Sequence, residues 1–156
     1  MQNKKILLIT YYWPPAGGSG VQRWLYFANN LAEMGYDVSV ITSKSKNYQL
    51  FDQELENYVS SKIKVIKISS FEPAKFFKSN NSNSDNINSN GLFNKIKLFI
   101  RANFFFPDSR KFWINKVVKT AIKYINLNKI DYLITSSPPF SLNIIGYKIK
   151  SKTNIK

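Results

Sequence analysis

The stretch from Lys5 to Trp24 constrains the fold more than any other part of the chain. Residues 5–10 are mostly apolar and predict a buried strand. Pro14 and Pro15 end that strand, because proline cannot donate a hydrogen bond to a β-ladder. A Gly-Gly-Ser-Gly turn follows at 17–20, and helical spacing begins at Val21. This order leaves backbone N–H groups free at a helix N-terminus, where the helix dipole favours an anion.

The rest of the chain continues the alternation of helices and strands. After Val21, apolar residues recur at steps of three and four, and Gly35 stands where a left-handed helix end is expected: Trp24, Leu25, Phe27, Ala28, Leu31 and Met34. Further strands are predicted at 37–42, 62–68 and 131–135, and helices within 43–61 and at 91–106, 112–127 and 140–150. Lysine recurs on one face of the 62–68 strand, which predicts a place near a sheet edge. Residues 79–90 are almost entirely Ser, Asn and Asp, which predicts a disordered insertion.

This alternation predicts an α/β fold in which residues 1–156 form one Rossmann-like domain with a doubly wound parallel sheet. With strand order 3-2-1-4, the sheet reverses between its first and fourth strands, and ligands bind beyond the carboxyl ends of the strands at such a reversal. The loops 11–19 and 136–139 follow these two strands and lie at this reversal. We expect a binding site there that contains Gly17, Gly18, Ser19, Arg23, Ser136, Ser137 and Pro138. Residues 153–156 are expected to begin another strand, and one side of the fourth strand is expected to be unpaired.

Composition excludes several kinds of catalytic and metal site. The chain has no Cys and no His, which excludes the usual zinc site, a Cys nucleophile and a Ser-His-Asp triad. We therefore expect no metal, and no cofactor beyond a donor substrate. No general base stands out, because Asp108 and Asp131 fit a turn and a strand start. The absence of Cys fits a reducing compartment, and a cytoplasmic location is predicted.

The formal net charge of +14 favours an anionic partner. Nucleic acid is not expected, because lysines are dispersed over every element and no RNA- or DNA-binding module is recognisable. The segment 91–106 is apolar on one helical face, while Lys95, Lys97 and Arg101 lie away from that face. This pattern predicts an interfacial helix on anionic lipid, at the inner face of the plasma membrane. The alternative is a helix docked on protein.

We consider four interpretations of the glycine turn. As a dinucleotide fingerprint it fits poorly, because Arg23 stands where the third glycine belongs and the second strand ends at Thr42-Ser43 without an acidic residue. It lacks the Gly-Lys-Ser/Thr of a P-loop. The remaining interpretations are a turn that faces the phosphate or sugar of a nucleotide-sugar, and a tight turn with no ligand.

Several motifs resemble the N-terminal domain of family 4 glycosyltransferases. They are Tyr12 to Arg23, Leu31 to Thr42, Phe106-Pro107-Asp108 with Trp113, and Asp131 to Ser141 with Gly146. The likeness covers most of the chain except the Ser/Asn-rich insertion.

The resemblance implies one half of a GT-B enzyme, in which two Rossmann-like domains face each other across a cleft. The N-terminal half holds the acceptor, a cell-envelope glycan or lipid-linked sugar, and the C-terminal half binds the nucleotide-sugar donor. Gly17 and Gly18 would approach the donor phosphates and the transferred sugar, and the retaining chemistry needs no metal. Because no donor domain follows in this sequence, we expect a half that is inactive alone and needs that domain in trans. The alternative is a non-catalytic Rossmann module that binds a membrane or a partner.

Overall fold

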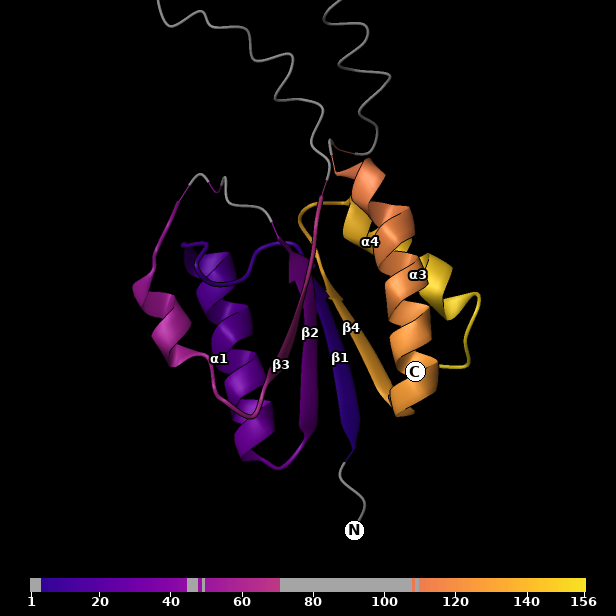
Figure 1. Ribbon diagram of the computed structural model, residues 1–156, viewed down its shortest axis with the longest axis horizontal. Coiled ribbons are helices and arrows are strands. Elements are labelled where there is room, and N and C mark those ends of the chain that lie inside the picture. The colour runs from indigo at the N-terminus through magenta and orange to yellow at the C-terminus, as the bar shows by residue number, and fades with distance from the viewer. Residues whose placement is uncertain (1–3, 45–47, 49, 71–107, 109) are drawn as a thin grey trace, which may run out of the picture.

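The computed structural model describes residues 4–44, 48, 50–70, 108 and 110–156. Its strands are β1 (Lys5–Thr10), β2 (Asp37–Ser43), β3 (Lys64–Ile68) and β4 (Tyr132–Ser136). They form one parallel sheet in the order β3-β2-β1-β4 (Figure 1). This confirms the predicted Rossmann-like α/β fold, the strand order and the place of β3 at an edge. The predicted insertion at 79–90 and the predicted helix at 91–106, with Lys95, Lys97 and Arg101, lie outside the described residues.

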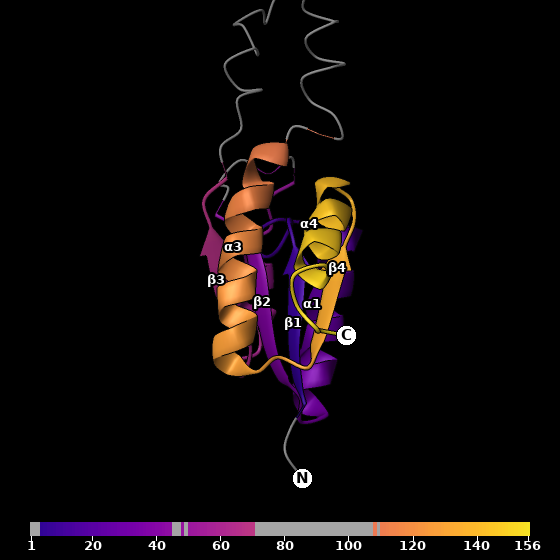
Figure 2. The ribbon, with the colours of Figure 1, turned by 90° about the vertical axis from the view of Figure 1, so that its right-hand side faces the viewer.

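Helices cover both faces of the sheet. The helix α1 (Ser19–Glu33) lies on one face, and α3 (Lys111–Asn128) and α4 (Ser141–Lys150) lie on the other (Figures 1 and 2). The connection between β2 and β3 contains a short 3-10 helix, η1 (Glu54–Tyr58). Successive β1 side chains point to opposite faces, so Leu8 packs in the α1 layer while Leu7 and Ile9 pack in the α3–α4 layer.

The buried stripe of α1 differs from the predicted one. The helix begins at Ser19, two residues before the predicted start, and it buries Val21, Leu25, Ala28 and Ala32. Phe27 and Met34, which the spacing placed on the apolar face, are 43% and 74% exposed. A stripe one position away satisfies the same three- and four-residue spacing, and packing against the sheet selects between the two. Gly35 has a φ of 89°, which confirms the predicted left-handed end.

The outer side of β4 has a partner at one point. The Leu133 N–H donates to the Lys156 carbonyl oxygen at 2.9 Å, and Ile155 is buried in the α3–α4 layer. Residues 153–156 form no strand, so the expectation of a new strand there is wrong. As expected, no described strand pairs with the outer side of β4, and at Leu133 the tail bonds there instead. The Lys150 ammonium also donates to the Ile155 carbonyl oxygen at 2.6 Å, and the Thr153 hydroxyl donates to the Ile149 carbonyl oxygen at 2.8 Å. These bonds and the buried Ile155 side chain hold the tail without building a ladder.

The amino-terminal edge of the sheet is fastened by Asp131. Its Oδ2 accepts from the Lys5 backbone N–H at 2.7 Å, and the Asp131 N–H donates to the Lys5 carbonyl oxygen at 2.9 Å. The Lys5 ammonium also donates to the Asn128 carbonyl oxygen at 3.0 Å. These bonds join the starts of β1 and β4. Of the helices that the structure describes, none combines the length and apolar character needed to cross a membrane.

Candidate functional site

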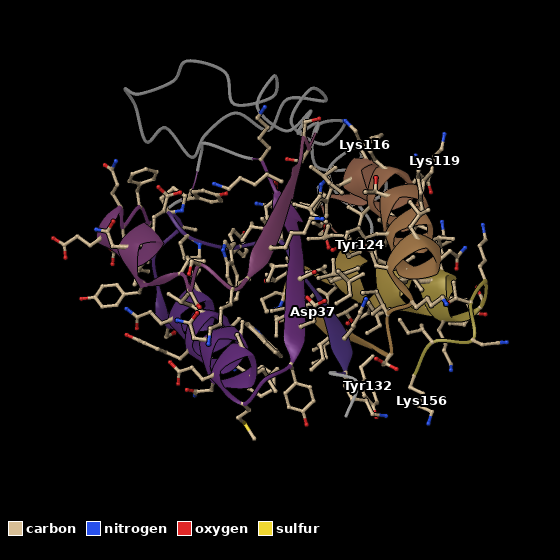
Figure 3. The ribbon with its side chains drawn as sticks, turned by 60° about the horizontal axis from the view of Figure 1, so that its bottom comes forward. Asp37, Lys116, Lys119, Tyr124, Tyr132 and Lys156 are labelled. Atoms are coloured by element: carbon tan, nitrogen blue, oxygen red, sulfur yellow. The ribbon has the colours of Figure 1, made fainter. Side chains whose placement is uncertain are left out.

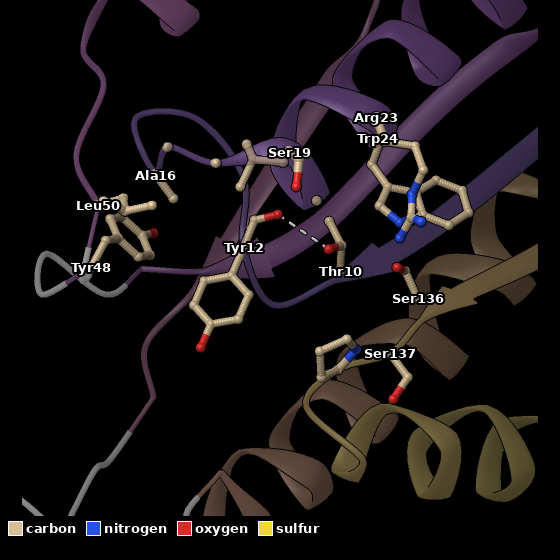
Figure 4. Close-up of a pocket in the computed structure, with 15 residues that line it drawn as sticks. Thr10, Tyr12, Ala16, Ser19, Arg23, Trp24, Tyr48, Leu50, Ser136 and Ser137 are labelled. Atoms are coloured by element: carbon tan, nitrogen blue, oxygen red, sulfur yellow. Dashed lines mark hydrogen bonds between the residues drawn. The ribbon is translucent and has the colours of Figure 1, made fainter.

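A cavity of about 360 Å³ lies at the carboxyl ends of β1 and β4 (Figure 4). It is bounded by the loop after β1, the first turns of α1 and the loop after β4. The structure brings together around it all seven residues predicted for the site: Gly17, Gly18, Ser19, Arg23, Ser136, Ser137 and Pro138. The cavity therefore lies where the strand order reverses, which is where such sheets bind ligands.

The glycine turn is held in place by the segment that follows β2. The Gly17 N–H donates to the Leu50 carbonyl oxygen at 3.0 Å, and the Asp52 N–H donates to the Pro15 carbonyl oxygen at 2.8 Å. A Cβ on Gly17 would lie 3.2 Å from the Asp52 Cβ, so only glycine allows this close approach without a shift. Gly18 has a φ of 104°, a conformation that glycine adopts at little cost. The turn therefore has a fixed position before any ligand binds.

The N-terminus of α1 supplies positive potential to the cavity. No side chain caps it, and its first turn contains no acidic residue. The first N–H groups of a helix have no intrahelical partner and carry the positive end of the dipole. Arg23, one turn further on, is exposed and lines the cavity. Within the described ranges, its guanidinium forms no ion pair.

The opposite wall is the loop from Ser136 to Phe140. The Ser137–Pro138 and Pro138–Pro139 peptide bonds are cis, as is Pro14–Pro15 in the facing loop. Ser136 is buried where β4 ends, and the Ser137 hydroxyl donates to the Pro139 carbonyl oxygen at 3.4 Å.

Asp108 anchors this wall. Its Oδ2 accepts from the Ser141 backbone N–H at 2.7 Å, and its Oδ1 accepts from the Arg110 backbone N–H at 2.8 Å. Arg110 in turn donates from Nη2 to the Tyr12 hydroxyl at 3.4 Å. The interpretation of Asp108 as a turn residue before a helix agrees with its position. The structure adds that its carboxylate joins the starts of α3 and α4.

Sequence reasoning missed part of the cavity wall. Tyr48 and Leu50 come from the polar connection after β2, where no pattern indicated a site. Trp24 was assigned to the apolar face of α1, yet it is only partly buried and borders the cavity. Thr10 directly precedes the predicted loop 11–19 and Tyr12 lies within it, and the Thr10 hydroxyl donates to the Tyr12 carbonyl oxygen at 3.1 Å (Figure 4). Their position beside or within the predicted loop was the available signal.

The lining determines which chemistry the cavity can perform. It contains hydroxyl groups, backbone N–H groups, aromatic rings and one guanidinium, but no carboxylate among the described residues. Nor does the described part of the chain hold a group of three or more His, Cys, Asp or Glu residues suited to a metal ion. The arrangement can therefore bind an anionic or hydroxyl-rich ligand, and it places no acid–base pair beside that ligand.

Fold and cavity together define a class: a Rossmann-like α/β domain with a cavity, lined by hydrogen-bond donors, where the strand order reverses. A comparison of the chain with protein-family models gave no match. A comparison with curated proteins gave no match either.

Proposed function

We propose that this chain is the acceptor-side half of a retaining glycosyltransferase. It would help transfer a sugar from a nucleotide-sugar to a cell-envelope glycan or lipid-linked acceptor. The proposal combines the sequence likeness to family 4 glycosyltransferases with the chemistry of the cavity. Catalysis would also require a donor-binding domain.

One observation carries the proposal. Two loops more than 100 residues apart in sequence meet at the reversal of the sheet, and both present groups suited to a phosphorylated sugar. The α1 N-terminus and Arg23 provide positive potential for phosphate. The Ser136 and Ser137 hydroxyls and the aromatic lining suit the hydroxyls and apolar faces of a sugar.

Binding of phosphorylated sugars to the purified chain tests the proposal. In a calorimetric titration with a panel of lipid-linked diphosphate sugars and nucleotide-sugars, we expect at least one to bind, because this half would hold the acceptor while Gly17 and Gly18 would face the donor phosphates. The Arg23→Gln variant should bind that ligand about 10-fold more weakly or worse, because a hydrogen bond to a charged group contributes about 1.5–3 kcal/mol. Lys62→Gln is the matched control, since it removes one exposed positive charge just before β3, at the opposite edge of the sheet.

Two results would contradict this assignment. If no member of the panel binds, or if Arg23→Gln and Lys62→Gln weaken binding equally, the cavity is not the binding site for the phosphorylated sugar. A separate assay addresses the division of labour between domains. Sugar transfer by the 156-residue chain alone would refute the expectation that it needs a donor domain.

A second candidate is a module that binds anionic membranes without catalysis. It is favoured by the charge of the α3–α4 layer, because neither helix contains Asp or Glu. Among the described residues the recorded ion pair, Lys67 with Glu56 at 3.4 Å, lies elsewhere. Figure 3 shows Lys116 and Lys119 on the exposed surface of α3.

Vesicle co-sedimentation separates two versions of this candidate. The first places the contact on Lys95, Lys97 and Arg101, and the second places it on α3. Neutralising Lys116, Lys119 and Lys123 together should abolish binding to anionic vesicles only in the second case. Failure of the wild-type chain to bind anionic vesicles at low salt would remove both, since such attraction is strongest at low ionic strength.

A further inference from the structure

The wall of the cavity contains a buried hydrogen-bond donor without an acceptor. The indole Nε1–H of Trp24 is buried, and it has no hydrogen-bond partner among the described residues. Buried tryptophan N–H groups usually find a partner, and an unmet buried donor is destabilising. Trp113 provides the contrast within the same chain, because its Nε1–H donates to the Ile68 carbonyl oxygen at 3.2 Å. The fold therefore satisfies the indole of Trp113 and leaves that of Trp24 unsatisfied at the cavity.

Arg23 lies against this indole. Its guanidinium carbon is 5.7 Å from the centre of the Trp24 ring, and Figure 4 shows both side chains on the Ser136 side of the cavity. Trp24 is itself held by an edge-to-face contact with Phe27, with ring centres 5.4 Å apart at 88°. Arg23 is exposed and can move, whereas Trp24 is fixed by packing. A ligand that draws the guanidinium toward itself removes the cover that Arg23 places over the indole ring.

We propose that Trp24 is a ligand-binding residue, and that its indole N–H donates to a phosphate oxygen held at the same time by Arg23. A phosphate oxygen accepts from both groups and carries a negative charge, whereas Arg23 has no anionic partner in the part of the chain that the structure describes. A sugar hydroxyl would satisfy the indole but leave the guanidinium uncompensated. The inference rests on the proposed function and specifies it, because the group recognised is the diphosphate. Nucleotide-sugars and lipid-linked acceptors both carry a diphosphate, so either is a source.

Nuclear magnetic resonance of the indole N–H groups tests this directly. The chain has three tryptophans, and Trp24→Phe identifies the Trp24 resonance in a ¹⁵N-labelled sample. We expect titration with uridine diphosphate glucose or with farnesyl diphosphate to move the Trp24 indole resonance downfield and to leave that of Trp113 in place. A response to the first ligand alone assigns the diphosphate to the donor, and a response to the second alone assigns it to a lipid-linked acceptor.

The Trp24→Phe variant supplies an affinity measurement. It keeps an aromatic ring against Phe27 but removes the N–H, so it should raise the Kd about 10-fold. The Trp113 indole resonance reports whether the variant is folded. If Trp24→Phe does not fold, the ligand-induced shift of the indole resonance in the wild-type chain still tests whether Trp24 binds the diphosphate.

Two outcomes would overturn the inference, and they are distinguishable. If the amides of Gly17 to Gly20 shift while the Trp24 indole does not, and Trp24→Phe binds as tightly as wild type, the role of Trp24 is wrong and the proposed function stands. If neither ligand shifts any of these resonances, the proposed function is wrong and the role of Trp24 is lost with it.

Discussion

Removing the Asp108 carboxylate should destabilise the protein and loosen one wall of the cavity. In Asp108→Ala two backbone donors, the N–H groups of Ser141 and Arg110, lose acceptors at 2.7 and 2.8 Å. The Ser141 bond acts as a cap for α4, whose own N-cap residue provides no side-chain hydrogen bond. Loss of a helix cap costs about 1 kcal/mol, with a range of about 0.5–2.

Counting both bonds, we expect Asp108→Ala to lower the free energy of unfolding by about 2 kcal/mol. For a domain of this size, that corresponds to a fall in Tm of about 4–8 °C. Asp108→Asn retains one oxygen acceptor and should lose about half as much. Thermal unfolding followed by circular dichroism measures both changes. Because Ser141 directly follows the loop that lines the cavity, ligand affinity should fall in the same order.

The control is Asp37→Ala, which removes an exposed carboxylate at the amino-terminal edge of the sheet. It should change Tm by less than about 1 °C, as surface substitutions usually do. The reasoning is refuted if Asp108→Ala matches this control, or if Asp108→Asn is as destabilising as Asp108→Ala.

Three further substitutions test packing around the cavity. Gly146→Ala should destabilise by about 1–3 kcal/mol, because the new Cβ would lie 3.0 Å from the Thr135 Oγ1; combining it with Thr135→Ala should recover most of the loss in urea unfolding. Ser141→Ala should leave stability unchanged or raise it by up to about 1 kcal/mol, since its buried hydroxyl has no partner among the described residues while its backbone N–H still donates to Asp108; a fall in Tm would count against this. Gly18→Ala should cost about 1–2 kcal/mol because of the φ of 104°, whereas Gly20→Ala, whose Cβ meets nothing within 4 Å, should not.

The placement of the two loops was predictable because it depends on connectivity. Once 5–10 and 131–135 are strands of one parallel sheet, the residues that follow each strand must lie at the same edge. No detail of side-chain packing is needed for that inference. Sequence reasoning alone therefore placed Gly17 and Ser137 at the same site.

What the sequence could not provide are contacts between residues that are distant along the chain. Nothing near Asp108 indicates that its carboxylate accepts from Ser141, 33 positions later. Spacing assigned Trp24 to a buried stripe, whereas packing buries the stripe beside it and leaves this indole at the cavity. Support of the glycine turn by Leu50 and Asp52 was hidden in the same way, because backbone hydrogen bonds depend on where the chain passes and not on side-chain type.

The bonds around Asp131 have a mechanical consequence. They clamp the starts of β1 and β4, the two strands whose far ends carry the cavity. At the far ends, no hydrogen bond joins residues 12–19 directly to residues 137–140 in the portion that the structure describes. β1 and β4 stay paired up to Thr10 and Ser136, so only the two loops beyond the strands can approach each other. A bound ligand could draw these loops together without breaking a hydrogen bond between the strands.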